Sequence, residues 1–163
     1  MRIPRSIVFI IVTVFMTLLL AVPASARPDA FESGQATLHQ MHQSGIMGRI
    51  DFTQTAGVVS ATGSATGLAP NTVARYVSLV YDRASVPGGP ESCEPTTTMA
   101  GMGVGFWTSD ANGNGTLHFF PFLGPVAPLG SFDTTSIRDT TINGGFGEAA
   151  VQACGEVALK PAN

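Results

Sequence analysis

The sequence predicts an all-β domain, an antiparallel sandwich or closed barrel of eight strands. Apolar and polar residues alternate along short segments rich in Val, Thr and Ser, which is the pattern of strands with one buried face. Turn residues, above all glycine, separate these segments at short intervals. The periodicity of an amphipathic helix is nearly absent, and a helix-compatible run occurs only near the N-terminus.

Residues 1–26 have the three-part layout of a secretory signal peptide. Arg2 and Arg5 precede an uncharged apolar run over residues 7–20, and the triplet Ala-Ser-Ala ends the segment. A retained membrane anchor is the alternative, but the run is shorter than the roughly 20 residues that a spanning helix needs. We therefore expect cleavage after the triplet, a mature domain of residues 27–163, and a secreted or periplasmic location.

The mature domain is mildly acidic. Without the two arginines of the signal peptide it has six Lys and Arg against eleven Asp and Glu, a net charge of −5. Such a chain offers no basic surface for nucleic acid or anionic lipid, and no later segment is long and apolar enough to span a membrane. We expect no nucleic-acid partner, and no stable membrane span after signal cleavage.

The first two strands are expected over residues 35–43 and 46–54. The earlier segment is rich in Gln and His, and alternation puts His39 and Met41 on one face and His42 on the other. The second segment has one apolar and one polar face. Its apolar set should point inward: Ile46, Gly48, Ile50 and Phe52.

The third and fourth strands are expected over residues 57–68 and 74–82. On the fourth strand the apolar Val77 fits the interior, so Tyr76 and Ser78 should face outward. One face of the third strand holds small residues, which would let neighbouring walls approach closely: Ala61, Gly63 and Ala65.

Four further strands complete the expected set. Phe106 and Trp107 fall on opposite faces of one strand, so one of them belongs to the core. Asp110 opens the segment DANGNG, which matches half of a calcium loop, but Pro121 stands where the bidentate acid belongs. A hairpin turn therefore explains that segment better. The four strands are expected over residues 103–110, 115–122, 132–139 and 151–159.

Cys93 and Cys154 are the only cysteines, and both lie in the exported part. An even count in an oxidising compartment favours a disulfide. Closing a loop of about 60 residues stabilises a fold by roughly 4 kcal/mol on the chain-entropy model. Free or metal-binding thiols are the alternative, but two distant cysteines make a weak metal motif.

Several segments resemble the copper/zinc superoxide dismutases. These are IMGRIDFTQ, the block GVVSATGSATGLAPNTVARYVSLVYD, the strand-turn-strand WTSDANGNGTL, and SIRD followed by ACGEVAL. The resemblance covers nearly all of the mature chain. It implies an eight-stranded antiparallel Greek-key barrel or sandwich, a disulfide between Cys93 in a long loop and Cys154 in the Ala-Cys-Gly motif, and a possible homodimer.

The same resemblance argues against the family's activity. The family's copper-binding His-Val-His triplet falls on Tyr76 and Ser78 with the valine between them, so both ligands are missing. The stretch 93–107, where the zinc ligands belong, has no His and no Asp. Val151 replaces the active-site arginine, and Asn143 is the nearest polar residue to the last copper position. Hydroxyl and amide oxygens do not replace imidazoles as copper ligands.

Two other readings use the three histidines. His39, Met41 and His42 could hold copper(I) through soft ligands, which makes a copper-binding or residually active protein the alternative function. A hydrolase using His118 is weaker, because no nucleophile-elbow motif is present and alternation makes His118 a surface ring. The favoured reading is a secreted, disulfide-bonded superoxide dismutase-like protein without an intact copper/zinc site. We expect it to bind no cofactor and to be a non-catalytic binding or structural module.

Overall fold

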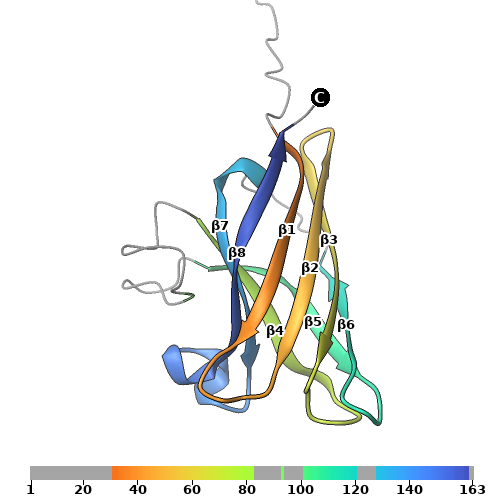
Figure 1. Ribbon diagram of the computed structural model, residues 1–163, viewed down its shortest axis with the longest axis vertical. Coiled ribbons are helices and arrows are strands. Elements are labelled where there is room, and N and C mark those ends of the chain that lie inside the picture. Colours follow the sequence, from red (N-terminus) through yellow and green to blue (C-terminus); the bar gives the residue numbers. More distant parts are fainter. Residues whose placement is uncertain (1–30, 83–92, 94–100, 121–127, 162–163) are drawn as a thin grey trace, which may run out of the picture.

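The structure is a computed structural model that describes residues 31–82, 93, 101–120 and 128–161. The expected signal peptide lies outside the described residues. Eight strands form a closed barrel in the order β1-β2-β3-β6-β5-β4-β7-β8, and every pairing is antiparallel (Figure 1). This confirms the all-β class and the eight antiparallel strands. The strands are β1 (Phe31–Gln40), β2 (Met47–Thr55), β3 (Val58–Thr66), β4 (Val73–Asp82), β5 (Gly101–Ser109), β6 (Gly115–Phe119), β7 (Phe132–Asp139) and β8 (Val151–Pro161).

The strand ends differ from the expected ones mainly in β1. Ser33 and Gly34 have low strand propensity, yet they pair with Lys160 and Leu159 of β8, so β1 begins before the expected Gln35. At its other end β1 stops at Gln40, because the chain turns there. β7 has the expected bounds.

The barrel core is built around Trp107 of β5, which is completely buried. The preceding residue, Phe106, lies on the opposite face of β5 and is half-buried, so one of the two aromatic residues belongs to the core, as predicted. The small residues of β3 make room for the indole, because a Cβ on Gly63 would lie 3.0 Å from Trp107 Cη2. The predicted inward set of β2 is also confirmed, with Ile46, Ile50 and Phe52 buried in the same core.

The expected orientation of β4 is wrong. Tyr76 and Ser78 point into the barrel, where they are 3% and 0% exposed, and Val77 lies on the outer face. Both hydroxyl groups are hydrogen-bonded inside the core. Trp107 Nε1 donates to Ser78 Oγ at 2.9 Å, and the Ala69 backbone N–H donates to Tyr76 Oη at 3.2 Å. Alternation failed because the outer face of β4 carries the apolar, half-buried Val77 and Leu79, while the inner face carries two hydroxyl groups, so polarity did not distinguish the two faces.

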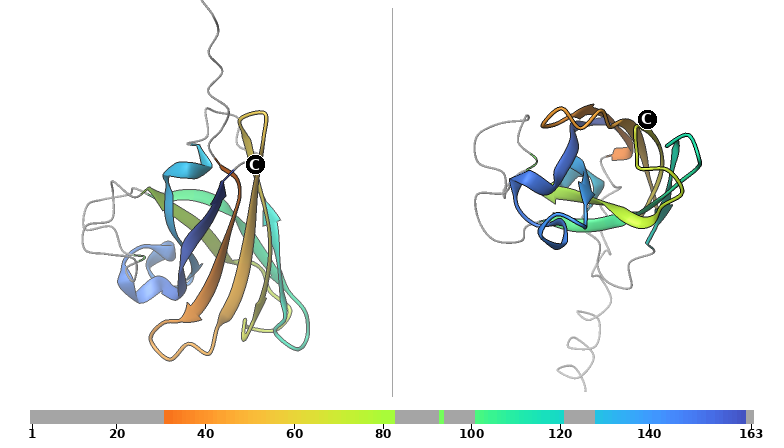
Figure 2. Two further views of the ribbon diagram at one scale, coloured as in Figure 1. Left: turned by 45° about the horizontal axis from the view of Figure 1, so that its top comes forward. Right: turned by 90° about the horizontal axis from the view of Figure 1, so that it is seen from below.

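A second, smaller apolar cluster lies on the outer surface of the barrel. It contains Tyr81 of β4, Val151 of β8 and the disulfide between Cys93 and Cys154, with half-buried Leu79 packed against it. The disulfide is as predicted. Beside it, short 3-10 turns lie outside the barrel next to β7 and β8 (Figure 2). These are η3 (Asn143–Gly145) and η4 (Glu148–Ala150), and a third turn, η2 (Leu129–Ser131), precedes β7. Within the described ranges, no helix has the length and apolar character needed to cross a membrane.

Candidate functional site

The outer face of β1 and β8 is hollowed beside the disulfide. The hollow measures about 730 Å³, and the described residues that line it come from these two strands and the residue that follows β1. Gly155 has its missing side chain on the opposite, inner face of the barrel, where a Cβ would collide with the backbone carbonyl of Thr37 and lie 3.2 Å from Leu38 Cδ2. The glycine therefore lets β1 and β8 approach closely, and the outward side chains of the two strands line the hollow. The lining residues are Gln35, Thr37, His39, Met41, Cys154, Gly155, Glu156 and Ala158.

The register between the two strands places His39 directly opposite Cys154. Side chains at such opposed positions lie on the same face of the sheet, about 5 Å apart at Cβ. The pairing extends one residue beyond β1, because the Met41 backbone N–H donates to the Gln152 carbonyl at 2.8 Å. Met41 therefore stays on the face that carries His39, and its side chain packs against the Cys93–Cys154 cluster.

His42 is not part of this hollow. The chain turns immediately after Met41, with positive φ angles of 52° at His42 and 60° at Gln43. Ser44 closes the turn, since its backbone N–H donates to the Met41 carbonyl at 2.9 Å. The expected continuation of the strand to residue 43 is thus wrong. Of the three residues considered for copper, the structure brings His39 and Met41 together and leaves His42 in an exposed turn.

Glu156 is the acidic side chain among the described residues that line the hollow, and sequence reasoning did not find it. It follows Cys154 by two positions on β8, so it shares the outer face with that cysteine. Its side chain is exposed to solvent. The alternation along β8 could have marked it as outward-facing. The proximity of Glu156 to His39, however, depends on the pairing of the first strand with the last, which one sequence does not reveal.

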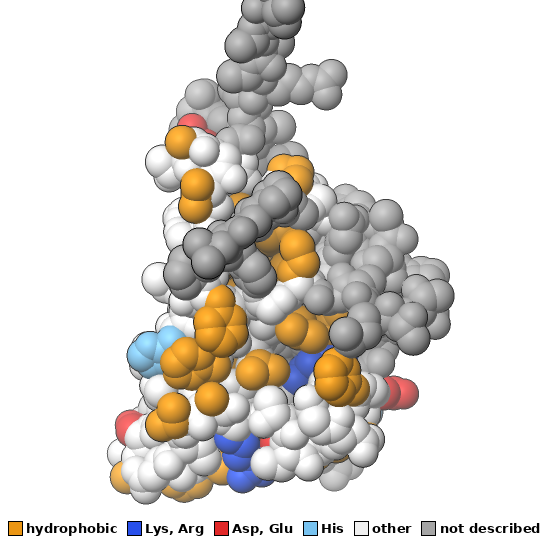
Figure 3. Space-filling model, turned by 180° about the vertical axis from the view of Figure 1, so that it is seen from behind, with side chains coloured by type: hydrophobic (Ala, Val, Ile, Leu, Met, Phe, Trp, Pro, Cys, Tyr) orange, Lys and Arg blue, Asp and Glu red, His pale blue; other side chains and the backbone are white. Residues whose placement is uncertain are grey.

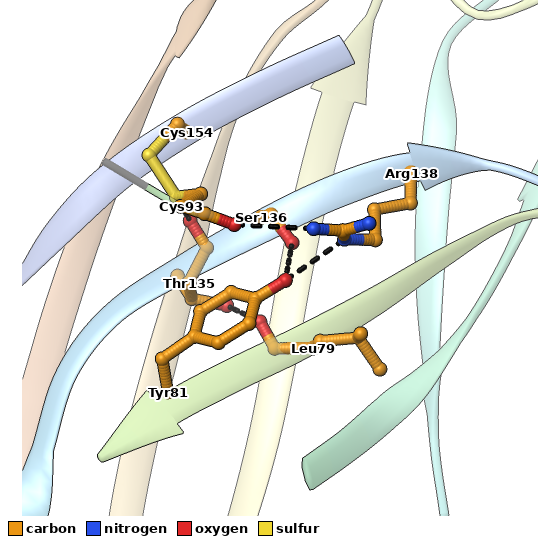
Figure 4. The surroundings of a disulfide bond; sticks show 7 residues. All are labelled: Leu79, Tyr81, Cys93, Thr135, Ser136, Arg138 and Cys154. Atoms are coloured by element: carbon orange, nitrogen blue, oxygen red, sulfur yellow. Dashed lines mark hydrogen bonds between the residues drawn. A yellow bond between two sulfur atoms is a disulfide. The ribbon is translucent and has the colours of Figure 1, made fainter. Parts of the chain in front are cut away.

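Arg138 of β7 lies on the other side of the disulfide and is 3% exposed (Figure 4). Its guanidinium donates to Tyr81 Oη at 2.8 Å and to the backbone carbonyls of Cys93 at 3.1 Å and Gly145 at 2.8 Å. It also reaches the carbonyl of Gly147 at 3.3 Å. A planar group with five donors suits this arrangement. Arg138 therefore joins β4, the disulfide segment and the η3–η4 turns, a role that the sequence did not indicate.

The remaining sequence candidates have structural explanations. Asp110 closes the β5–β6 hairpin, where it accepts hydrogen bonds from the Asn112 and Asn114 backbone N–H groups at 2.8 and 2.9 Å. The side chain of Asn114 also donates to it at 2.9 Å, and this bond is the main cause that lowers the pKa of Asp110. The hairpin turn is confirmed. Val151 is buried in the outer cluster, whereas Asn143 is exposed in η3.

His118 is an exposed surface ring, as predicted. It stacks on Phe106, with ring centroids 5.0 Å apart, and its Nε2 is 2.8 Å from Thr108 Oγ1. Neither contact supplies the carboxylate that a triad histidine needs. Phe120, 43% exposed, also contacts Phe106, and Figure 3 shows hydrophobic side chains gathered on this face.

No group of three or more His, Cys, Asp or Glu side chains in the described part of the chain is placed to hold a metal ion. The pair of His39 and Met41 falls outside this count, because one of its two side chains is a methionine thioether. Comparison with known proteins found no family model and no curated protein that matches this sequence. A binding site in the hollow is therefore inferred from the residues of this chain alone.

Proposed function

We propose that this chain is an extracytoplasmic binding module, built on a barrel of the superoxide dismutase type and without catalytic activity. The observation that carries the proposal is the hollow of about 730 Å³ on β1 and β8. Ligand sites in proteins commonly occupy about 300–1,000 Å³ and combine apolar walls with a few polar groups. Here the apolar parts are Met41 and Ala158, and the polar parts are the Thr37 hydroxyl, the His39 ring and the Glu156 carboxylate.

The strand order supports the superoxide dismutase type. β3 pairs with β6, and β4 pairs with β7, so two pairings join strands that are not consecutive in the chain. Such crossovers are what a Greek-key barrel requires. The disulfide between Cys93 and Cys154 also agrees with the pairing that the resemblance implies.

The outer face of β4 supports the absence of catalysis. Tyr76 and Ser78 point into the core, so they do not occupy the outward positions that the resemblance assigns to copper ligands, and the outward neighbours Val77 and Leu79 carry no imidazole. The three histidines of the chain do not form one group. His39 and His42 lie at the end of β1 and in the turn after it, and His118 lies on β6. A centre of imidazole ligands that cycles copper between two oxidation states needs more than this arrangement provides.

One experiment tests the absence of catalysis. The mature chain is incubated with copper and zinc, dialysed, and assayed for superoxide decay by pulse radiolysis. We expect a decay rate no faster than that of the same amount of unbound ion. Fast decay that is retained by the dialysed protein, and lost in the double variant His39→Ala, His42→Ala, would contradict the proposal in favour of a residually active enzyme.

A second experiment tests the location of the binding site. Amide NMR spectra of the labelled mature chain are recorded against panels of small ligands and ions. We expect the shifts to cluster at Thr37, His39 and Glu156 and to vanish in Ala158→Trp, where an indole fills the hollow from its exposed rim. Thr62→Trp, which puts the same indole on exposed β3, should leave the shifts unchanged. Binding that maps elsewhere on the barrel would refute this location.

A further inference from the structure

We infer that the hollow on β1 and β8 binds a soft monovalent cation, copper(I) or its analogue silver(I), between the imidazole of His39 and the thioether of Met41. The inference rests on the proposed function, because it names the ligand of the same hollow. The Glu156 carboxylate is the anionic group that balances the charge of the ion.

The backbone places both ligand side chains on one face. His39 and Met41 are two residues apart, and strand geometry separates such residues by about 7 Å along one face. The hydrogen bond from the Met41 N–H to the Gln152 carbonyl, 2.8 Å, keeps this geometry beyond the end of β1. Both side chains line the same hollow, so an ion in it can be reached from both.

The two groups differ in exposure in a way that suits an ion site. Met41 is half-buried and packs against the cluster of Tyr81, Cys93 and Cys154, so its position is restrained before an ion arrives. His39 is exposed, so its ring can receive an ion from solvent and turn toward the thioether. The site is therefore held on one side and open on the other.

The donor set decides which cation fits. A thioether is a soft, neutral ligand, and thioether with imidazole favours copper(I) over the hard ions calcium and magnesium. Zinc and copper(II) favour imidazole and carboxylate groups in larger sets, and no such set of three occurs among the described residues. Since neither ligand carries charge, the carboxylate of Glu156 and the mature chain's net charge of −5 supply the attraction for a cation.

Silver(I) is the probe of choice. Its use needs no reductant, so the Cys93–Cys154 disulfide stays closed and no thiol can imitate the site. The oxidised mature chain is titrated with silver(I), desalted and analysed for metal content, and the His39 ring and Met41 methyl resonances are followed by NMR. We expect one equivalent of silver, shifts at both side chains, and the same shifts with copper(I) under ascorbate.

Matched variants identify the ligands. His39→Ala and Met41→Leu should each raise the dissociation constant by at least about tenfold, since each removes one of two ligands. Leu keeps the apolar volume that Met41 packs into the outer cluster, and His39 is exposed, so neither change should unfold the chain. The controls are His42→Ala and Met47→Leu, which alter an exposed histidine and an exposed methionine outside the hollow. Both should bind silver as the parent does.

Two outcomes would overturn the inference. One is the absence of silver uptake, and the other is uptake that His39→Ala and Met41→Leu leave unchanged. If a different ligand then shifts Thr37 and Glu156 and is blocked by Ala158→Trp, the inference fails while the proposed function stands. If no ligand meets that test, both fail.

Discussion

Trp107 Nε1 donates a hydrogen bond to Ser78 Oγ at 2.9 Å, and both side chains are completely buried. The bond joins the neighbouring strands β5 and β4 on the inner side of the barrel, where water cannot replace a lost partner. A buried indole N–H without an acceptor is costly, and the Ser78 hydroxyl supplies the acceptor that Trp107 needs at the centre of the core.

We therefore expect Ser78→Ala to lower the free energy of unfolding by about 1–3 kcal/mol, the cost of a buried donor left unsatisfied. Urea unfolding monitored by tryptophan fluorescence measures the change. Ser64→Ala on exposed β3 is the control and should change stability by less than about 0.5 kcal/mol. Equal effects of the two substitutions would show that the hydrogen bond is unimportant.

The disulfide should contribute strongly to stability. Cys93 and Cys154 are 61 residues apart, and the chain-entropy model assigns about 4 kcal/mol to a loop of that length. The double variant Cys93→Ala, Cys154→Ala should lose stability of this order in chemical denaturation. Mass analysis of the parent under non-reducing conditions should detect no alkylatable thiol. Two alkylated cysteines in the natively purified protein would contradict the bond.

Arg138→Met should loosen the layer outside the wall while the barrel stays folded. The change removes the donor shared by Tyr81 and the carbonyls of Cys93 and Gly145. Tyr81 Oη keeps its contact with Ser136 Oγ, whereas each buried carbonyl left unsatisfied costs about 1–3 kcal/mol. Hydrogen exchange should quicken around η3 and η4 before it does in β2. Arg49→Met is the control, because that arginine makes an exposed ion pair with Asp51, and such pairs contribute about 0–1 kcal/mol. Unchanged exchange around η3 and η4 in Arg138→Met would refute the role.

Asp139 should make stability depend on pH in the acid range. Burial alone would raise the pKa of this carboxyl, but hydrogen bonds from Arg75 and Thr141 outweigh it and lower the pKa below its ordinary value. A lowered folded pKa gives stability that is full above the unfolded value, about 3.9. That stability is lost as pH falls from there through the folded pKa.

The expected measurement is a set of unfolding curves at several pH values. The stability difference between the parent and Asp139→Asn should be constant near neutral pH and should shrink below about pH 4. Asp51→Asn serves as an exposed comparison and should give a smaller difference throughout, since solvent screens that pair. A difference that grows as pH falls would have the wrong sign.

The sequence best predicted the orientation of strands that have one buried face and one solvent-exposed face. In β2, Ile50 and Phe52 point inward as their alternation indicates, because the opposite side of that strand meets water. In β4 the inner face is covered by the core, whereas the outer face carries the apolar Val77 and Leu79, which are half-buried. Polarity then reflects hydrogen-bond partners and not exposure, which is why Tyr76 and Ser78 were placed on the wrong side.

The candidate site was predictable in part. His39 and Met41 could be recognised as neighbours on one face from their spacing alone. His42 is separated from His39 and Met41 by a turn in which His42 itself has a positive φ angle. Such an angle is uncommon outside glycine, and the sequence does not indicate it. Glu156 and Cys154 enter the site only through the pairing of β1 with β8, a contact between the two ends of the domain.

That terminal pairing determines how the barrel responds to mechanical load. Phe31 at the start of β1 pairs with Pro161 at the end of β8, so both strand ends lie at one end of the barrel (Figure 1). Tension applied at these two residues acts across the β1–β8 ladder and opens its hydrogen bonds one after another, like a zipper. We expect single-molecule pulling to record early yielding at low force, followed by a halt where β8 reaches Cys154, whose covalent link to Cys93 carries the load.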